Sequence, residues 1–100
     1  MGYEVVVSRI AEADLAEIIE YIARDNPDAA LRIARELVSR TRTIQDFPRI
    51  GRVVPEFQIE TLRELVHGAY RIVYQIDEAK KRIAIARFWH AARGTPGISS

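Results

Sequence analysis

A three-residue break, Asp25-Asn26-Pro27, constrains the fold of this chain most, because an amphipathic helix is predicted on each side of it. The first helix is predicted over residues 8–24, with Ser8 as its N-cap. The second is predicted over residues 27–46, since Asn26 can cap it and proline suits the first helical position, where no N–H is needed. So short a connection forces the two helices to lie antiparallel, as a hairpin.

Both predicted helices carry one apolar stripe, so one side of the hairpin must be covered by another layer of the structure. The stripe of the first helix has the spacing i, i+3, i+4 and i+7 and consists of Leu15, Ile18, Ile19 and Ile22. The stripe of the second helix consists of Ala30, Ile33, Ala34, Leu37, Thr41 and Ile44. The rest of the chain has the pattern of strands and loops, so the covering layer is expected to be a β-sheet.

Runs of β-branched and aromatic residues that end at turn residues predict four strands. These strands are expected over residues 3–7, 61–66, 69–76 and 82–90. Residues 48–58 are expected to form a loop, held down by Phe47, Ile50, Val54 and Phe57. The predicted fold class is α+β, in the order β-α-α-β-β-β. An antiparallel sheet is expected, with the N-terminal helical hairpin packed on one face.

Alternation along the strands predicts which side chains share a face of this sheet. In strand 69–76 the residues Tyr70, Ile72, Tyr74 and Ile76 share one face, and Arg71, Val73 and Gln75 share the other. In strand 82–90 the same rule places Arg87 and Trp89 with Ile83 and Ile85, and it places His90 on the opposite face. If the tyrosine face packs on the helices, Arg71 lies on the other side, which is expected to be partly open and to hold any site.

The composition limits the class of protein. A chain of 100 residues with 48% hydrophobic residues predicts one domain over residues 1–100, with a flexible tail at 94–100. There is no cysteine and there are only two histidines, His67 and His90, so neither a cofactor nor a metal is expected. No apolar run reaches the roughly 20 residues of a membrane span. The start lacks the pattern of a signal peptide, so the expected location is the cytoplasm, with no membrane partner.

Charge is unevenly distributed along the chain. Residues 1–60 hold 8 basic and 11 acidic side chains, whereas residues 61–100 hold 7 basic and 3 acidic ones. A polyanion or an acidic partner is therefore expected to bind the C-terminal part. A solvated surface with a chance asymmetry is the simpler interpretation.

Local spacing reveals no catalytic motif: a phosphate-binding glycine loop, HExxH and GxSxG are all missing from the sequence. The candidate site residues are instead scattered basic side chains on or after the predicted strands. They are Arg63, Arg71, Arg82, Arg87, His90 and Arg93. These positions are where an anion would be bound, if one is bound.

Each candidate also has a purely structural interpretation. Arg71 can hold a carboxylate such as Glu64 across the strands, and His90 can be a satisfied edge or core histidine. Arg87 and Arg93 can be solvated. Trp89 is interpreted as a core residue rather than as a platform for stacked bases.

Several short segments, taken in order, resemble the RelE/ParE toxin superfamily of bacterial type II toxin–antitoxin systems, and the ParE side more closely. The resemblance covers nearly all of residues 4–93. The segments that carry it are Ala13-Asp14-Leu15-Ala16-Glu17-Ile18, Tyr21-Ile22, Phe47-Pro48-Arg49-Ile50-Gly51-Arg52, Pro55-Glu56, Arg63-Glu64-Leu65-Val66, Tyr70-Arg71-Ile72-Val73-Tyr74 and Trp89-His90-Ala91-Ala92-Arg93. The order and spacing of these segments, rather than any one of them, support the resemblance to this family. The predicted β-α-α-β-β-β order of elements is also that of the family.

This resemblance implies a growth-inhibiting toxin that a cognate antitoxin protein neutralises in a hetero-oligomeric complex. Such antitoxins wrap the toxin with a segment that folds on binding, which suits an acidic, amphipathic partner. ParE-like members poison DNA gyrase, and RelE-like members cut mRNA in the ribosome. The FPRIGR segment and the WHAAR ending favour gyrase as the target, with ribosome-dependent RNA cleavage as the alternative. A third interpretation is an interaction module that has lost its toxicity and still binds the antitoxin.

The two activities imply different site residues. In the nuclease, Arg71 would bind the phosphate, while Arg87 and His90 would complete a metal-independent catalytic set. RelE-like nucleases also carry lysines on the preceding strand, where this chain has Leu62 and Glu64, so the set is incomplete. In the gyrase inhibitor, the residues expected to bind the target or the antitoxin are Arg63, Arg71, Arg87, Trp89 and Arg93.

Overall fold

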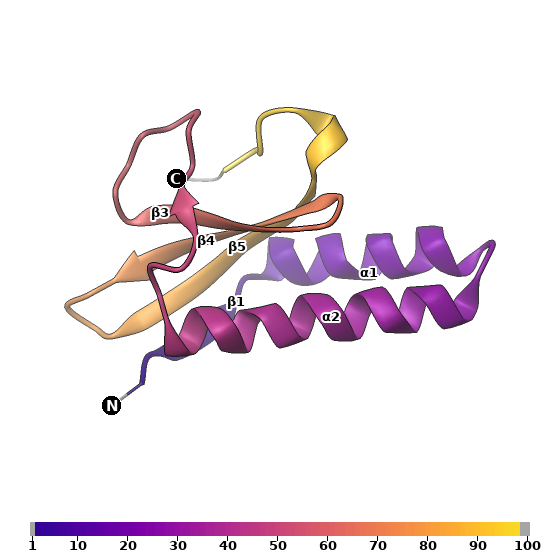
Figure 1. The fold of residues 1–100 in the computed structure, drawn as a ribbon, viewed down its shortest axis with the longest axis horizontal. Helices are drawn as coiled ribbons and strands as arrows, with labels where there is room; N and C mark the ends of the chain where they lie inside the picture. The colour runs from indigo at the N-terminus through magenta and orange to yellow at the C-terminus, as the bar shows by residue number, and fades with distance from the viewer. Residues whose placement is uncertain (1, 99–100) are drawn as a thin grey trace.

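The first half of the chain is mostly helical, and most of a five-stranded sheet follows it (Figure 1). The computed structural model describes residues 2–98. Its elements are β1 (Glu4–Val7), α1 (Arg9–Ala23), α2 (Pro27–Asp46), β2 (Arg52–Val53), β3 (Leu62–His67), β4 (Tyr70–Asp77), β5 (Arg82–His90) and a 3-10 turn, η1 (Ala91–Arg93). The predicted α+β fold and its order of elements are confirmed, with one addition, because the expected loop contains the short strand β2.

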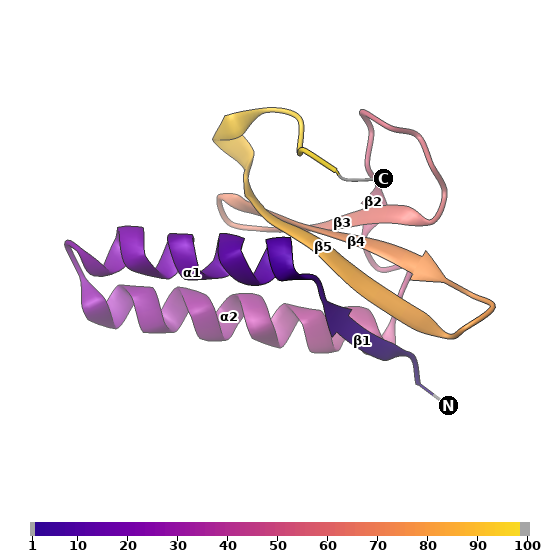
Figure 2. The ribbon, with the colours of Figure 1, turned by 180° about the vertical axis from the view of Figure 1, so that it is seen from behind.

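The sheet has the strand order β1-β5-β4-β3-β2. Strand β1 pairs in parallel with β5, and the other neighbours are antiparallel, so the sheet is mixed where an antiparallel sheet was expected. Figures 1 and 2 show the helical hairpin along one side of the sheet, with the loop between α1 and α2 well beyond the end of the strands. The distal part of the hairpin therefore has no sheet to cover it. Among residues 2–98, no helix is long and apolar enough to span a membrane.

The helix starts follow the local rules on which their prediction rested. The Ser8 hydroxyl accepts a hydrogen bond from the Ala11 amide at 3.1 Å, and the Asn26 side chain accepts one from the Ala29 amide at 3.0 Å. Between the hairpin and the sheet lies one apolar cluster. Its buried members are Ala11, Leu37, Ile44, Leu65, Ile72, Tyr74, Ile76, Ile83, Ile85 and Phe88.

An irregularity in the β4–β5 ladder corrects the predicted faces of β5. Val73 pairs with Arg87, but the next residue, Tyr74, pairs with Ile85, so Ala86 is an extra residue. Such a bulge reverses the side on which the following side chains lie. The prediction that Arg87 and Trp89 share a face with Ile83 and Ile85, and that His90 lies on the opposite face, is therefore wrong. Phe88 joins these isoleucines in the core, and Arg87 lies on the other face.

The face opposite the helices is covered, which corrects the expectation that it is partly open. A second apolar cluster there has Val54, Leu62 and Val73 as its buried members, with Ile98 packed against it. Pro96 is also buried, so residues 94–98 have defined contacts that the expected tail did not include. Residues 99 and 100 of that tail lie outside the described part of the chain. Of the expected loop anchors only Val54 is buried, whereas Phe47, Ile50 and Phe57 are exposed.

The turn before β2 is fastened to the sheet by Tyr74. Its hydroxyl donates to the Pro48 carbonyl at 2.6 Å and accepts from the Gly51 amide at 3.0 Å. Burial raises the pKa of this tyrosine, so the hydroxyl stays protonated and can donate. A Cβ at Gly51 would lie 2.4 Å from the Glu64 carbonyl oxygen, so only glycine lets the turn come this close. Arg63 holds the same turn, donating to the Gly51 carbonyl at 2.9 Å.

Candidate functional site

Arg71 is the second residue of β4, with only 7% of its surface exposed, and all three nitrogens of its guanidinium donate hydrogen bonds within the fold. Its two terminal nitrogens donate to both carboxylate oxygens of Glu56, at 3.0 and 2.7 Å. One of them also donates to the Gly94 carbonyl at 3.1 Å, and Nε donates to Glu64. The interpretation that Arg71 holds Glu64 is confirmed, and Glu56 is a second partner that the sequence did not indicate.

Arg71 and Glu64, which are buried, pair with Glu56 and Arg52, which are exposed. We call these four residues the buried ion-pair cluster, after its two central members. The Glu64 side chain has no exposed surface and receives a second hydrogen bond, from Arg52 Nε at 2.7 Å. The carboxylate of Glu56 raises the pKa of Arg71, and Arg71 in turn lowers the pKa of Glu56. Each charge is therefore compensated within the cluster, which is the condition for burying charges at tolerable cost.

Arg87 is also bound internally rather than solvated. Its Nε and Nη2 each donate to one oxygen of Asp14 at 2.8 Å, and Nη1 donates to the Gly97 carbonyl at 2.7 Å. The same carboxylate accepts the Phe88 amide at 3.1 Å. The hydrogen bonds to Asp14 raise the pKa of Arg87. Sequence reasoning missed Asp14 as a site residue. A usable signal was its spacing of three residues from Ala11 and four from Ile18, which places its carboxylate on the packed face of α1, where it needs a partner.

Trp89 is a core residue, as expected, with 6% of its surface exposed. Its indole N–H donates to the Gly94 carbonyl at 3.0 Å. The guanidinium carbons of Arg87 and Arg93 lie 4.7 and 4.0 Å from its ring centroid, so both are in cation–π distance. Arg93 itself is exposed, and within residues 2–98 it has no carboxylate at ion-pair distance. Its cation is therefore available to a partner.

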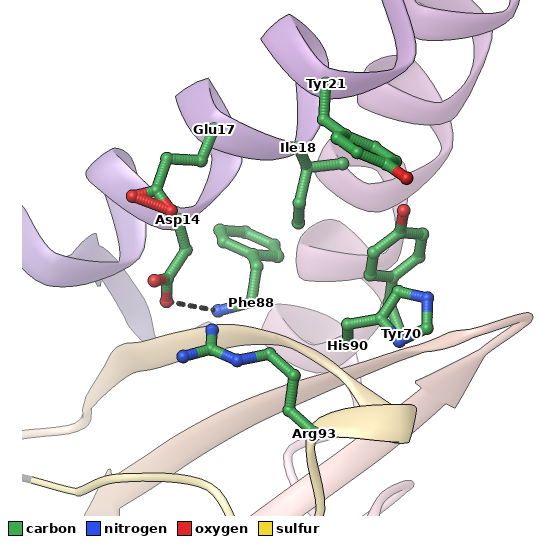
Figure 3. A pocket seen from close by; sticks show the side chains of 8 residues that line it. All are labelled: Asp14, Glu17, Ile18, Tyr21, Tyr70, Phe88, His90 and Arg93. Atoms are coloured by element: carbon green, nitrogen blue, oxygen red, sulfur yellow. Dashed lines mark hydrogen bonds between the residues drawn. The ribbon is translucent and has the colours of Figure 1, made fainter.

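A cavity of about 360 Å³ opens beside Arg93, between α1 and the ends of β4 and β5 (Figure 3). We call it the α1–β5 cavity. It is lined by Asp14, Glu17, Ile18, Tyr21, Tyr70, Phe88, His90 and Arg93. Ile18 and Phe88 are its apolar surfaces, while acidic and basic groups lie near one end and the tyrosines at the other. Such a mixture of apolar walls and few polar groups is typical of a binding site for a protein side chain or small ligand.

The aromatic end of this cavity is arranged by hydrogen bonding and stacking. Tyr70 and His90 make an edge-to-face contact with ring centroids 5.2 Å apart. His90 Nδ1 accepts the Ala92 amide at 3.1 Å, so the neutral ring carries its proton on Nε2. Burial, and secondarily Tyr21, raises the pKa of Tyr70. Tyr21 is 72% exposed, and Figure 3 shows the Tyr70 hydroxyl pointing toward it.

The predicted site residues are thus not gathered in one place. His90 and Arg93 meet at the α1–β5 cavity, with Trp89 beneath Arg93. Arg71 lies in the buried ion-pair cluster, and Arg87 is bound to Asp14. Arg63 holds the turn before β2, and Arg82 is exposed at the surface. Arg63 pairs with Glu60 at 2.7 Å, and Arg82 pairs with Glu4 at 3.0 Å.

A helical hairpin on a mixed sheet of this topology defines the toxin fold shared by ParE and RelE proteins, and the comparisons agree. One solved structure of similar fold is a chromosomal ParDE toxin–antitoxin system from P. aeruginosa. Its TM-score is 0.72 and its sequence identity 22%, and the match covers 88% of this chain and 95% of the ParDE chain. The second is the toxin–antitoxin complex RelBE2 from Mycobacterium tuberculosis, with a TM-score of 0.68 and 23% identity, covering 90% and 99%.

Sequence comparison assigns the family. Residues 5–94 match the family described as ParE toxin of type II toxin–antitoxin system, parDE. The chain is also 37% identical over 91 residues to Toxin RelE2 of Caulobacter vibrioides, covering 90% of this chain and 97% of that protein. This protein therefore belongs to the ParE toxin family, within the RelE/ParE superfamily of type II toxins, and the predicted resemblance is confirmed.

Proposed function

We propose that this toxin stops growth by poisoning DNA gyrase and that a cognate antitoxin neutralises it in a hetero-oligomeric complex. The observation that carries the choice of gyrase is the state of Arg71. Its four hydrogen bonds go to Glu56, Glu64 and the Gly94 carbonyl, so it is neutralised inside the fold. A toxin that acts by binding needs no free cation at this position.

Metal-independent RNA cleavage would make different demands on the same residues. It needs a cation free to stabilise the charge that develops on the phosphorane, and an acid or base within reach of it. Here Arg71 and Arg87 are both paired with carboxylates, and Glu64 would repel a phosphate at the position of Arg71. His90 lies at the α1–β5 cavity, on the other side of the sheet from Arg87. These contacts favour a binding function over catalysis.

An antitoxin partner is supported by the relatives. Both solved structures of similar fold are described as toxin–antitoxin assemblies, one as a ParDE system and one as a RelBE2 complex. The matching family is likewise a family of toxins that work in such pairs. We infer the same arrangement for this chain.

The exposed end of β5 is the part of the molecule that best fits a target. Arg93 and Tyr21 border the α1–β5 cavity and are exposed, and His90 lines it. Aromatic and arginine side chains of this kind often dominate the binding energy of protein interfaces. We therefore assign the contact with gyrase to the α1–β5 cavity and Arg93.

The alternative function is ribosome-dependent RNA cleavage, and one observation favours it. The similar protein from Caulobacter vibrioides carries the name Toxin RelE2, which places it on the RelE side of the superfamily. In that case His90 would act as acid or base, and Arg71 would have to leave the buried ion-pair cluster to reach RNA.

Two measurements separate these functions. The first is a map of new mRNA 5′ ends a few minutes after induction of the toxin without its antitoxin. The second is DNA supercoiling by purified gyrase with added toxin. Growth arrest with gyrase inhibition and no new ends inside translated codons is the expected result. Cuts inside codons, with gyrase unaffected, would instead establish the nuclease.

A matched pair of variants tests the contact site. Arg93→Ala removes an exposed arginine at the α1–β5 cavity, and Arg9→Ala removes an exposed arginine of α1 that is also outside the ion pairs of residues 2–98. Loss of an arginine that is a hot spot of an interface weakens binding about tenfold or more. The toxin concentration that half-inhibits gyrase should rise accordingly for Arg93→Ala and stay unchanged for Arg9→Ala. Equal inhibition by both variants would exclude Arg93 from the contact.

A further inference from the structure

The outward face of α2 combines exposed apolar side chains with unpaired arginines. Leu31 is 54% exposed and Val38 is 41% exposed. Arg35 lies four residues after Leu31, and Arg42 lies four residues after Val38. Neither arginine has a carboxylate at ion-pair distance anywhere in residues 2–98. By helical geometry these four positions form one stripe along about three turns of the helix. We call this stripe the α2 outer face.

The spacing along this face is that of a helix–helix seam. Leu31, Ala34 and Val38 are separated by three and four residues, as are the a and d positions of a heptad. A shallow groove of about 310 Å³ lies over the same turns, lined by Ala34, Arg35, Val38, Ser39 and Arg42. The small side chain of Ala34 lets a second helix approach closely. Arg35 and Arg42 lie beside the seam, at positions that select a partner by charge.

The rest of the molecule leaves this face without an internal partner. The sides of α2 that carry Leu37 and Ile44 pack into the core, and Glu36 is bound to His67 of β3 at 2.9 Å. Figures 1 and 2 show that the end of α2 near the loop to α1 extends beyond the sheet. Arg35 has no acidic residue three or four positions away in the helix, so the usual intrahelical pairing of a solvated face is not possible for it.

From these observations we propose that the α2 outer face is a docking site for an acidic amphipathic helix of the antitoxin. The partner helix would place its apolar residues against Leu31, Ala34 and Val38, and its glutamates or aspartates against Arg35 and Arg42. The seam of about three helical turns calls for a partner segment of roughly 12 residues. This inference rests on the proposed function, because it takes the antitoxin as the partner, but it is independent of the target of the toxin.

The test uses the full-length toxin and the protein encoded beside its gene. The first variant, Arg35→Glu with Arg42→Glu, reverses the charge of the face, and the second, Leu31→Gln with Val38→Gln, removes its apolar contacts. Arg9→Glu with Lys80→Glu is the matched control, because it changes net charge equally at exposed positions elsewhere. All six positions are at the surface, and circular dichroism verifies that each variant is folded. Dissociation constants are measured by calorimetry at low and at physiological salt.

The expected result is that both α2 variants bind the neighbouring protein at least about tenfold more weakly, while the control stays within about twofold. The charge-reversed variant should also lose most of the salt dependence of binding. In cells, both α2 variants should still arrest growth, but co-expression of the antitoxin should no longer restore it.

Three other outcomes would overturn the proposal, and they are distinguishable. Equal binding by all variants would exclude this face and leave the proposed function intact. No binding of the unmodified toxin to the neighbouring protein would overturn both the docking site and the antitoxin partner. Self-association of the toxin that Leu31→Gln with Val38→Gln abolishes, with unchanged antitoxin binding, would assign the face to a second copy of this chain.

Discussion

The two faces of the sheet are stabilised by different interactions. On the helix side, Ile72, Ile83 and Leu37 belong to one apolar cluster. On the opposite side, a smaller apolar cluster is combined with the buried ion-pair cluster of Arg52, Glu56, Glu64 and Arg71. The difference shows that an arginine on a strand of this fold can serve to bind neighbouring segments of the chain. In this chain Arg71 of β4 and Arg87 of β5 hold the loop, the helix α1 and the C-terminal segment to the sheet.

The helix side should be the more sensitive to loss of side-chain volume. Leu37→Ala removes a side chain with no exposed surface, and we expect it to lower the free energy of unfolding by about 2–5 kcal/mol, as large-to-small core changes do. The measurement is chemical denaturation. Leu31→Ala is the matched control, because Leu31 lies on the same helix but is exposed, and it should cost less than about 0.5 kcal/mol. Similar losses for both leucines would contradict the assigned core.

The opposite side should instead be sensitive to the breaking of charge pairs. Arg71→Met leaves Glu64 buried with Arg52 as its one remaining partner and leaves Glu56 unpaired, which should cost about 3 kcal/mol. Adding Glu64→Leu removes the buried charge as well and should recover most of that loss. Denaturation of the wild type and of both variants measures the coupling. If the double variant has the same free energy of unfolding as Arg71→Met, the loss of stability does not come from the unpaired charge of Glu64.

A smaller effect is expected where the loop meets the opposite face. Gly51→Ala places a methyl group against the Glu64 carbonyl and the Tyr74 hydroxyl, and such overpacking costs about 1–3 kcal/mol. Gly68→Ala is a useful comparison, since nothing lies within 4 Å of its added Cβ and its cost comes from a positive φ of 57° alone. Thermal unfolding of both variants separates crowding from backbone strain. A Gly51 variant with unchanged stability would mean that the turn can move away from β3.

The smallest effect concerns exposed carboxylates at the loop ends, and it appears as a pH dependence. Arg49 and Arg63 lower the pKa of Glu60 from 4.5 to about 2, and the Tyr3 hydroxyl and Arg49 do the same for Glu78. Because protons bind these groups more readily in the unfolded chain, their contribution is complete above pH 4.5 and is lost as pH falls toward 2. Denaturation across this range should show stability decreasing, with a shallower slope for Glu60→Gln with Glu78→Gln. An unchanged slope would assign the acid sensitivity to other groups.

The sequence alone determined the elements of this fold. Local rules sufficed for the helix starts at Ser8 and Asn26 and for every strand except β2, because capping and periodicity depend on neighbours in the chain. They also sufficed for the family, for the buried Trp89 and for the interpretation that Arg71 holds Glu64. All of these depend on residue types at fixed spacings.

Apart from the pair of Arg71 and Glu64, only the tertiary structure decided what these arginines contact. The bulge at Ala86 moves Arg87 to the other face, and a bulge depends on the pairing of two strands rather than on one strand's pattern. Asp14 and Glu56 are 73 and 15 residues away from the arginines they bind, so no local spacing reveals them. The C-terminal segment covers the sheet because Gly94 and Gly97 supply carbonyls to buried donors. A buried donor forms its hydrogen bond with whichever acceptor the folded chain brings within reach, and the tertiary structure alone determines which acceptor that is.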